Sequence, residues 1–311
     1  MRMCAVSVDL DEIPNYFAIH GLPAPEPPTA TLVYDLAVDR LHAWALERSI
    51  PLTVFAVGSD LARAESARKL RSAHEAGFEI ANHSLDHRYD LVRLGRTEMS
   101  RQVFEGIQAI ERVVGTVPVG FRAPGYTVTD DLFGILAELG VGYDASVFPC
   151  PLYWAAKATK IAAIAACGRT SRSIVDTPLM LTAPTRPYRV GRPYWRRGQG
   201  VLELPIQVTP GLRLPFYGTA VTLWGTQVAR RLARACVGEP FINLELHGID
   251  VLDADDGLEA LRSHQIDLRV PVREKLKALG AVIDALREAG YLFVTMKSAA
   301  LRLAEVASAS S

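Results

Sequence analysis

The stretch Gly77-Phe78-Glu79-Ile80-Ala81-Asn82-His83 combines a helix stop, a short apolar run and two polar side chains. An amphipathic segment over residues 59–76 precedes it, and glycine is common just past the end of a helix. We therefore predict a helix over residues 59–76 and a strand over residues 78–81. Parallel βα proteins place their chemistry directly after such strands, so the polar pair marks a candidate functional position.

The same alternation recurs along the chain. Short β-branched or aromatic runs alternate with longer amphipathic segments, which is typical of βα repeats and not of a helical bundle or a β-sandwich. Thr97 can cap one helix that Gly115 ends, and Pro271 suits the first turn of another. We predict further helices over residues 29–49, 97–115, 129–139 and 271–290, and further strands ending at Asp9 and over residues 52–57, 119–121, 241–246 and 291–295.

The segment over about residues 146–240 breaks this pattern and is rich in proline, arginine and aromatic residues. It contains one strand-like run, over residues 201–207, and no internal repeat. A core built from this segment alone would be too small to stand by itself. We therefore expect a single α/β domain over residues 1–311, a barrel of βα units with one long insertion after the fifth strand.

Composition excludes several classes of protein. The 311 residues carry 34 basic and 34 acidic side chains, so there is no excess of positive charge for nucleic-acid binding. The four cysteines form no C-x-x-C pair, which argues against a zinc ribbon or a redox dithiol. The apolar run at the start of the sequence is too short for a signal peptide and soon reaches acidic residues. No other run approaches the ~18 apolar residues of a membrane-spanning helix. These features predict a cytoplasmic protein.

Polar side chains follow most of the predicted strands. Because the carboxyl ends of parallel strands meet at one rim, these side chains are expected to converge there. A convergent set of Asp, His and Arg is what a metal-assisted hydrolase requires. The strand ends carry Asp9 and Asp11, Asn82 and His83, Arg122 to Gly125, Tyr143 and Asp144, and His247.

His83 and His87 lie four residues apart, which would place both imidazoles on one face of a helical turn. There they could share a cation with a carboxylate from another strand end, leaving positions on Zn²⁺ open for water and substrate. Asp9 and Asp11 would share one face of an extended chain, so that one could bind the metal and the other accept a proton. The alternatives for this pair are a solvated loop, a helix cap, or a D-x-D phosphatase of the haloacid dehalogenase type.

Three further strand-end groups suit acyl transfer chemistry. An arginine at position 122 within ~4 to 6 Å of Asp9 would hold that carboxylate ionised, as a general base must be. The backbone N–H of Gly125 could stabilise an oxyanion. His247 suits a general acid near neutral pH, although a single histidine is more often a hydrogen-bonded core residue.

Taken in order, these motifs resemble the polysaccharide deacetylase family, also called the NodB-homology or carbohydrate esterase 4 family. The resemblance covers residues 3–149 well and residues 201–300 more loosely. It implies an irregular (β/α)₇ barrel and a hydrolase acting on carbon–nitrogen bonds other than peptide bonds, in linear amides. The motifs are Asp9-x-Asp11, Asn82-His83-Ser84-x-x-His87, Phe121-Arg122-Ala123-Pro124-Gly125, Tyr143-Asp144-Ala145-Ser146 and Leu246-His247.

The resemblance also implies a role for each residue. Asp11, His83 and His87 would hold a divalent metal, usually zinc. Asp9 would be the general base, and Arg122 would orient it. The N–H of Gly125 would meet the oxyanion, and His247, for which Asp144 is a candidate acidic partner, would protonate the leaving amine. Gly125 stands where many relatives have tyrosine, so Tyr126 becomes the candidate for stacking on the substrate.

The insertion adds a segment, residues 186–197, with five arginines and three aromatic residues. Arg192, Trp195 and Arg196 could contact phosphate and stack on a sugar, and a solvated loop is the alternative. Residues 153–166 are apolar apart from Lys157 and Lys160, so they could form a lid, a core helix or a helix at a membrane surface.

We therefore expect an enzyme that removes an acetyl or formyl group from an amino sugar carrying phosphate in a nucleotide or polyprenyl linkage, the latter at the inner face of the membrane. Two alternatives remain open: an amidase of the same fold that acts on a non-sugar amide, and a catalytically silent carbohydrate-binding relative. The sequence does not determine the oligomeric state.

Overall fold

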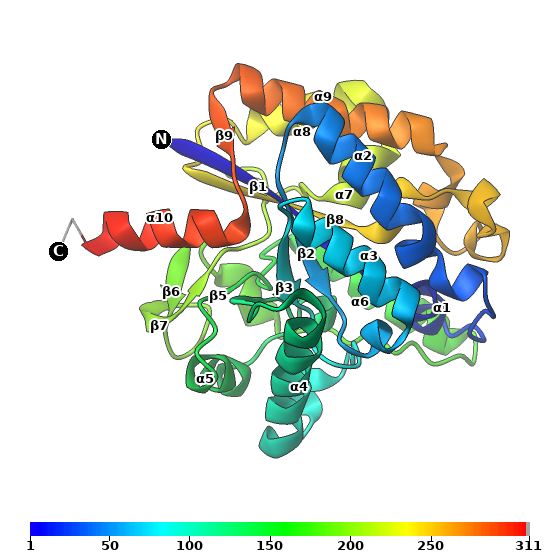
Figure 1. Ribbon diagram of the computed structural model, residues 1–311, viewed down its shortest axis with the longest axis horizontal. Coiled ribbons are helices and arrows are strands. Elements are labelled where there is room, and N and C mark those ends of the chain that lie inside the picture. The colour runs from blue at the N-terminus through cyan, green and yellow to red at the C-terminus, as the bar shows by residue number, and fades with distance from the viewer. Residues whose placement is uncertain (309–311) are drawn as a thin grey trace.

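The computed structural model describes residues 1–308 of the chain, and it shows one curled, mostly parallel β-sheet wrapped by helices (Figure 1). The strand order is β6-β7-β5-β4-β3-β2-β1-β8, with β9 also paired to β1. The sheet forms an open half-barrel, so the predicted α/β barrel class is confirmed in an open form. The strands are β1 (Arg2–Asp9), β2 (Leu52–Ala56), β3 (Glu79–Asn82), β4 (Gly120–Phe121), β5 (Tyr143–Asp144), β6 (Tyr188–Val190), β7 (Arg197–Glu203), β8 (Phe241–His247) and β9 (Tyr291–Phe293).

Strand β1 lies at the centre of this arrangement. It pairs in parallel with β2 on one edge and with β8 on the other, and β9 pairs with its first residues. Its register places Asp9 opposite His247 on β8. From Met3 onward every residue of β1 is buried, because helices cover one face of the sheet and the half-barrel interior covers the other. The end of β1 that carries Asp9 is therefore packed on both faces of the sheet.

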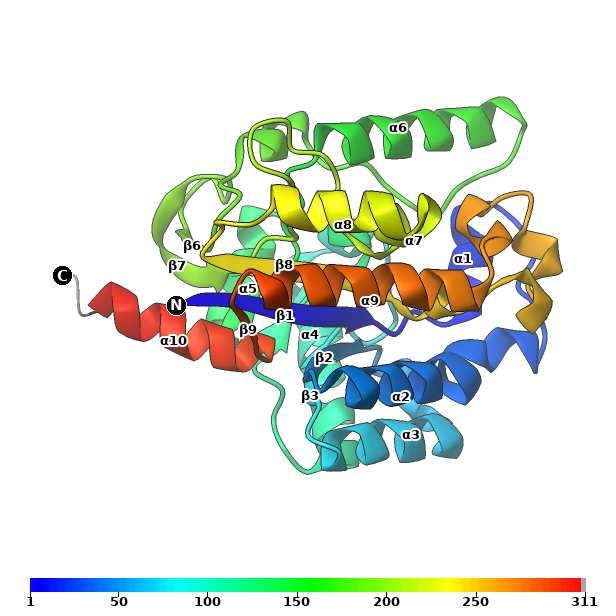
Figure 2. The same ribbon diagram turned by 90° about the horizontal axis from the view of Figure 1, so that it is seen from above.

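Helices connect and cover the strands, with α6 and α8 on one side of β1 and α2 and α3 on the other (Figure 2). The predicted helices over residues 129–139 and 271–290 are present, the first capped by the hydroxyl of Thr129. The helices are α1 (Ile13–Ile19), α2 (Val38–Arg48), α3 (Ala64–Glu75), α4 (Arg96–Val114), α5 (Asp130–Glu138), α6 (Pro151–Ala166), α7 (Gly218–Leu223), α8 (Gly225–Ala235), α9 (Val272–Glu288) and α10 (Met296–Ser308). None of these helices combines the length and apolar character needed to cross a bilayer.

Three predicted helical segments differ from the structure. The helix expected over residues 59–76 begins as a 3₁₀ turn over Ser59–Ala62 and becomes regular at Ala64, and the expected cap Thr97 lies inside α4. The helix expected over residues 29–49 begins as a 3₁₀ turn and a π-turn and becomes regular only at Val38. The buried carboxylate of Glu12 accepts hydrogen bonds from the N–H groups of Val33 and Tyr34, both at 3.1 Å, and so ties this turn to the end of β1. The turn expected to be helical at residues 83–87 is a loop instead, since His87 has a φ of 49°.

The segment over residues 146–240 contributes to the main sheet. Strand β7 pairs in parallel with β5, and β6 pairs with β7 in antiparallel fashion. The strand expected over residues 201–207 lies four residues earlier, at Arg197–Glu203. Residues 153–166, named as a possible helix, form most of α6, whereas α7 and α8 were not predicted.

Candidate active site

Asp11, His83 and His87 come together just beyond the ends of β1 and β3. Oδ1 of Asp11 lies 3.1 Å from Nε2 of His83 and 3.1 Å from Nε2 of His87. All three side chains are buried, and these three atoms have no hydrogen-bond partner among the described residues. Buried polar atoms without partners are costly, so a cluster of them indicates an absent ligand. One carboxylate and two imidazoles fit a divalent cation such as Zn²⁺.

The surrounding chain fixes both histidines. Nδ1 of His83 lies 2.8 Å from the carbonyl oxygen of Arg122. A carbonyl can only accept, so Nδ1 carries the proton and Nε2 presents its lone pair to the cluster. The imidazoles in turn act on Asp11. Burial raises the pKa of its carboxyl group, but His87 and His83 offset this and hold the pKa well below the usual range.

Asp9 is held by a fully buried arginine. The guanidinium of Arg122 donates to Oδ1 of Asp9 at 2.6 Å, to the hydroxyl of Ser7 at 2.8 Å and to the carbonyl of Ala145 at 2.8 Å. It also lies over the ring of Phe55, 4.1 Å from the centroid. The other oxygen of Asp9, Oδ2, has no hydrogen-bond partner among the described residues and lies 3.7 Å from Nε2 of His83. One carboxylate oxygen is therefore fixed and the other is free to accept a proton.

His247 leaves β8 between a carboxylate and a phenol. Its Nδ1 lies 3.1 Å from Oε1 of Glu245, and its Nε2 lies 3.1 Å from the hydroxyl of Tyr126 and 4.0 Å from Oδ2 of Asp11. Burial lowers the pKa of His247, but the facing carboxylates, that of Glu245 first, raise it to about 9. The imidazole is thus held protonated near neutral pH, as a general acid requires.

The carboxylate partner of His247 differs from the candidate. Asp144 accepts two hydrogen bonds from Ser146, at 3.0 and 2.8 Å, and therefore supports a neighbouring loop. Glu245 takes the place beside the imidazole because residues two apart on a strand share a face. The alternation Glu245-Leu246-His247 was the sequence signal for this pair.

A second cluster of possible metal ligands consists of Asp9, Glu245 and His247. The interactions of its members argue against a second cation. Asp9 is already paired with the guanidinium of Arg122, and Glu245 with the imidazole of His247. Adding a cation beside two positively charged groups would be unfavourable. We therefore interpret this cluster as a base and an acid, each with its own partner.

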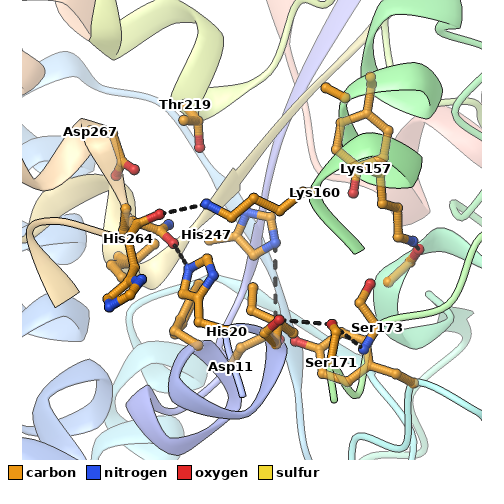
Figure 3. A pocket seen from close by; sticks show the side chains of 18 of the residues that line it. Asp11, His20, Lys157, Lys160, Ser171, Ser173, Thr219, His247, His264 and Asp267 are labelled. Carbon is orange, nitrogen blue, oxygen red and sulfur yellow. Dashed lines mark hydrogen bonds and ion pairs between the residues drawn. The ribbon is translucent and has the colours of Figure 1, made fainter. Parts of the chain in front are cut away.

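These groups border a cavity of about 390 Å³ (Figure 3). Asp9, Asp11 and His247 lie at its strand-end side, together with Gly125 and Tyr126. Gly125 has a φ of 62°, and a Cβ there would lie 2.9 Å from the ring of Tyr89. Glycine fits this position without strain, whereas a side chain would meet both the positive φ and the ring of Tyr89. Tyr126 lines the cavity beside it, as expected.

Three of the candidate substrate-binding residues, Arg192, Trp195 and Arg196, do not line this cavity. They lie in the turn between β6 and β7, at the amino end of β7, and β7 runs parallel to β5. The turn is therefore at the opposite end of the sheet from the strand ends that carry the site. Its Tyr194 packs on Phe133, with ring centroids 5.7 Å apart, and this contact holds it against α5. The structure thus corrects the phosphate contact expected for these arginines.

Sequence reasoning named residues 153–166 as a possible lid and missed the rest of the far wall of the cavity. Residues from α1, α6 and the loop after β8 form it, with Lys157, Lys160, His20 and His264 among the polar ones. These residues follow no strand, so the strand-end rule could not find them.

A curled parallel sheet with this site at its strand ends defines a half-barrel α/β protein of the NodB type. One solved structure supports this fold: a putative polysaccharide deacetylase from Mycobacterium smegmatis is 18% identical, with a TM-score of 0.58 over 97% of this chain and 90% of that one. An acetyl xylan esterase of family 4 from Clostridium thermocellum, in complex with a cobalt ion, is 14% identical, with a TM-score of 0.48 over 96% and 89%.

The family comparison is more specific. Residues 37–143 match the model of the polysaccharide deacetylase family, which confirms the resemblance drawn from the motifs. The match agrees with the predicted class of enzyme, a hydrolase of amide bonds. A search among curated proteins found no match to the chain.

Proposed function

We propose that this protein is a metal-dependent hydrolase that removes an acetyl or formyl group from the nitrogen of an amino sugar, and that residues 1–311 form one catalytic domain. The observation that carries the proposal is the convergence of three buried units on one cavity: Asp11 with two histidines, Asp9 with its arginine, and His247 with Glu245. A binding protein has no use for a free carboxylate oxygen facing a protonated imidazole, so this arrangement favours catalysis.

Each residue then has a task. Asp11, His83 and His87 would hold the cation, with Zn²⁺ the first choice for this donor set. When bound, such a cation lowers the pKa of water and polarises a carbonyl. Asp9 accepts the proton of the attacking water at Oδ2, while Arg122 keeps the carboxylate oriented. The N–H of Gly125 donates to the developing oxyanion. His247 gives its proton to the leaving nitrogen.

The first test is metal content. Protein purified without chelators is expected to hold close to one equivalent of a divalent metal by mass spectrometry. The double variant His83→Ala, His87→Ala is expected to hold almost none, because two of three donors are gone. His42→Ala, which changes a histidine outside the site, is the control. A wild type that stays metal-free after incubation with zinc or cobalt would contradict the proposal.

The second test separates binding from chemistry. Asp9→Asn keeps the size of the side chain but removes the proton acceptor, so turnover of N-acetyl sugars is expected to fall by about 10²- to 10⁴-fold. Metal content should stay at the wild-type level, since Asp9 is outside the proposed ligand set. Asp39→Asn, an exposed carboxylate on α2, should leave both unchanged. Full activity of Asp9→Asn would refute its role as base.

The position of α6 supports a further proposal about location. Its inner face lines the cavity, and its outer face is apolar, with Leu152 57% exposed. An uncharged face of this kind is suited to peripheral contact with a membrane surface beside the mouth of the cavity.

A further inference from the structure

One wall of the cavity is formed by a single face of α6. Tyr153, Ala156, Lys157, Lys160 and Ile161 all line the cavity, at spacings of three and four residues. These spacings bring side chains onto the same side of a helix. In Figure 3 Lys160 extends past His247 toward the carbonyl of His264, whereas Lys157 extends along the other side of the cavity toward the carbonyl of Gly125. The cavity is therefore lined by two ammonium groups, one on each side.

Neither ammonium group has a carboxylate partner. Nζ of Lys157 donates to the carbonyl of Gly125 at 2.8 Å, and Nζ of Lys160 donates to the carbonyl of His264 at 2.9 Å. Each ammonium carries three N–H groups, so two on each lysine remain available. No ion pair within 4.0 Å joins either lysine to an acidic residue in the described part of the chain.

The nearby acidic groups are already engaged. Asp267, which also lines the cavity, is paired with the buried Lys275 at 3.2 Å. Asp176 attracts Lys157 from a distance, but its oxygens accept from the hydroxyl of Tyr194 at 2.9 Å and the N–H of Thr177 at 2.6 Å. The positive charge of the wall is therefore only weakly compensated by the protein itself.

The hydration of Lys157 also favours an anion. Burial lowers the pKa of Lys157 to about 8, so it still carries its charge at neutral pH but is short of hydration. A poorly hydrated ammonium beside a cavity binds an anion more strongly than one in open solvent.

Neutral hydrogen-bonding groups lie beside the lysines. Ser171 and Ser173 line the same end of the cavity, and so does His20, whose Nε2 lies 3.1 Å from Oε1 of Gln265 (Figure 3). The hydroxyl of Ser171 already donates to the carbonyl of Ile19 at 2.7 Å, and a neutral His20 that donates from Nε2 to Gln265 has no second N–H. The hydroxyl of Ser173 can donate to an oxygen that the lysines leave uncovered.

We propose that Lys157 and Lys160 form a subsite for a phosphate group carried by the substrate, which makes the substrate class a phosphorylated N-acyl amino sugar. The substrate assignment rests on the proposed function, whereas phosphate binding by this wall does not. The phosphate ester lies on α6 while the acyl group faces Asp9 and His247, so the cavity orients a ligand that has an anion at one end and an amide at the other.

The binding test uses inorganic phosphate and glucosamine 6-phosphate with the metal-loaded protein in titration calorimetry. Both ligands are expected to bind to the wild type. Lys160→Met keeps the length of the side chain but removes the charge, so affinity should fall about tenfold or more. Lys277→Met, an exposed lysine on α9, should bind as the wild type does. Equal affinity in Lys160→Met and wild type would overturn the subsite.

Lys157 touches the carbonyl of Gly125, so its variant tests position as well as charge. Lys157→Arg should retain most of the phosphate affinity, and Lys157→Met should lose it. A circular dichroism melt of each variant checks that α6 and the fold remain. If both variants fold and bind phosphate equally well, Lys157 is not part of the subsite and the inference fails.

A second set of measurements identifies the source of the phosphate and keeps the two proposals separate. A soluble source predicts a higher kcat/KM for N-acetylglucosamine 1-phosphate than for N-acetylglucosamine, with the preference lost in Lys160→Met. If the phosphate belongs to a lipid, the wild type should bind phosphatidylglycerol vesicles more tightly than phosphatidylcholine vesicles. This preference should be lost in Lys160→Met. If the protein deacetylates neutral sugars but shows neither the preference for the sugar phosphate nor the preference for anionic vesicles, the subsite is overturned and the proposed function stands. If it binds phosphate but deacetylates no sugar, the subsite is supported and the proposed function is overturned.

Discussion

Glu245 and His247 alternate along β8 and meet at the cavity because side chains two apart on a strand share a face. Glu245 holds the imidazole at Nδ1, which leaves Nε2 facing Tyr126 and the cavity. Glu245 is thus a positioning residue that also controls the charge of the proposed acid.

Replacing Glu245 is expected to change the pH dependence of the reaction. The facing carboxylates raise the pKa of His247 to about 9, so the protonated acid persists up to that pH and activity falls above it. Glu245→Gln removes the nearest negative charge and lowers the pKa. The alkaline limb of the profile of kcat against pH should therefore move to lower pH by about one unit or more. An unmoved alkaline limb would contradict the role of Glu245, and Glu288→Gln on the surface is the control.

At the scale of elements, α4 supports the loop that carries both histidines. The carbonyl of Gln102 accepts from the N–H of Leu85 at 2.9 Å, and its side chain accepts from the N–H of Asp86 at 3.0 Å. Gly106, one turn further along α4, packs directly against the end of β3. A Cβ at this position would overlap Oδ1 of Asn82 and lie 2.9 Å from the backbone carbon of Ser84.

Gly106→Ala is therefore expected to destabilise the protein. Alanine favours a helix by about 1 kcal/mol over glycine, but overlap in a packed interior costs about 1 to 3 kcal/mol, so a net loss of about 1 to 2 kcal/mol should appear in urea unfolding. Zinc affinity should fall with it, because the loop that holds His83 must move.

Gly134→Ala on α5 is the matched control, since a Cβ there meets only arginine side chains, at 3.7 Å or more. This variant should be more stable than the wild type by about 0.5 to 1 kcal/mol. A stabilised Gly106→Ala would show that α4 does not press on the histidine loop.

At the scale of the whole molecule, buried acids near the site make stability depend on pH. Burial raises the pKa of Glu12 to about 7, and burial together with Glu12 raises the pKa of Asp60 to about 8. In the unfolded chain these groups release their protons near pH 4. Between about pH 4 and 8 the folded state therefore binds more protons, and its stability falls as the pH rises.

The melting temperature of the metal-free protein should accordingly fall between pH 5 and pH 8. Asp60→Asn removes one of the protonated acids, so relative to the wild type it should gain about 3 to 4 kcal/mol of stability between pH 5 and pH 8. Asp284→Asn, a surface carboxylate paired with Arg48, is the control. An equal pH slope in Asp60→Asn and wild type would contradict this account.

Local patterns in the sequence were enough to predict the βα order of the chain and most of the strand-end side of the site. Apolar runs, capping residues and glycine stops are local signals, and they located β1, β2, β3 and β8 to within about two residues. Since parallel strands end at one rim, the residues after them had to gather, and the structure brings Asp9, Asp11, His83, His87 and Arg122 together. The roles of these residues remain predictions for the experiments above.

The residues that face that rim are set by long-range packing. The pairing of β7 with β5 turns the arginine-rich loop to the opposite end of the sheet, whereas α6 lies across the cavity and brings in Lys157 and Lys160. Both outcomes depend on contacts between segments far apart in the chain. Local periodicity predicts which face of a segment is apolar. It does not predict which other segment packs against that face, because such contacts leave no short-range pattern in the sequence.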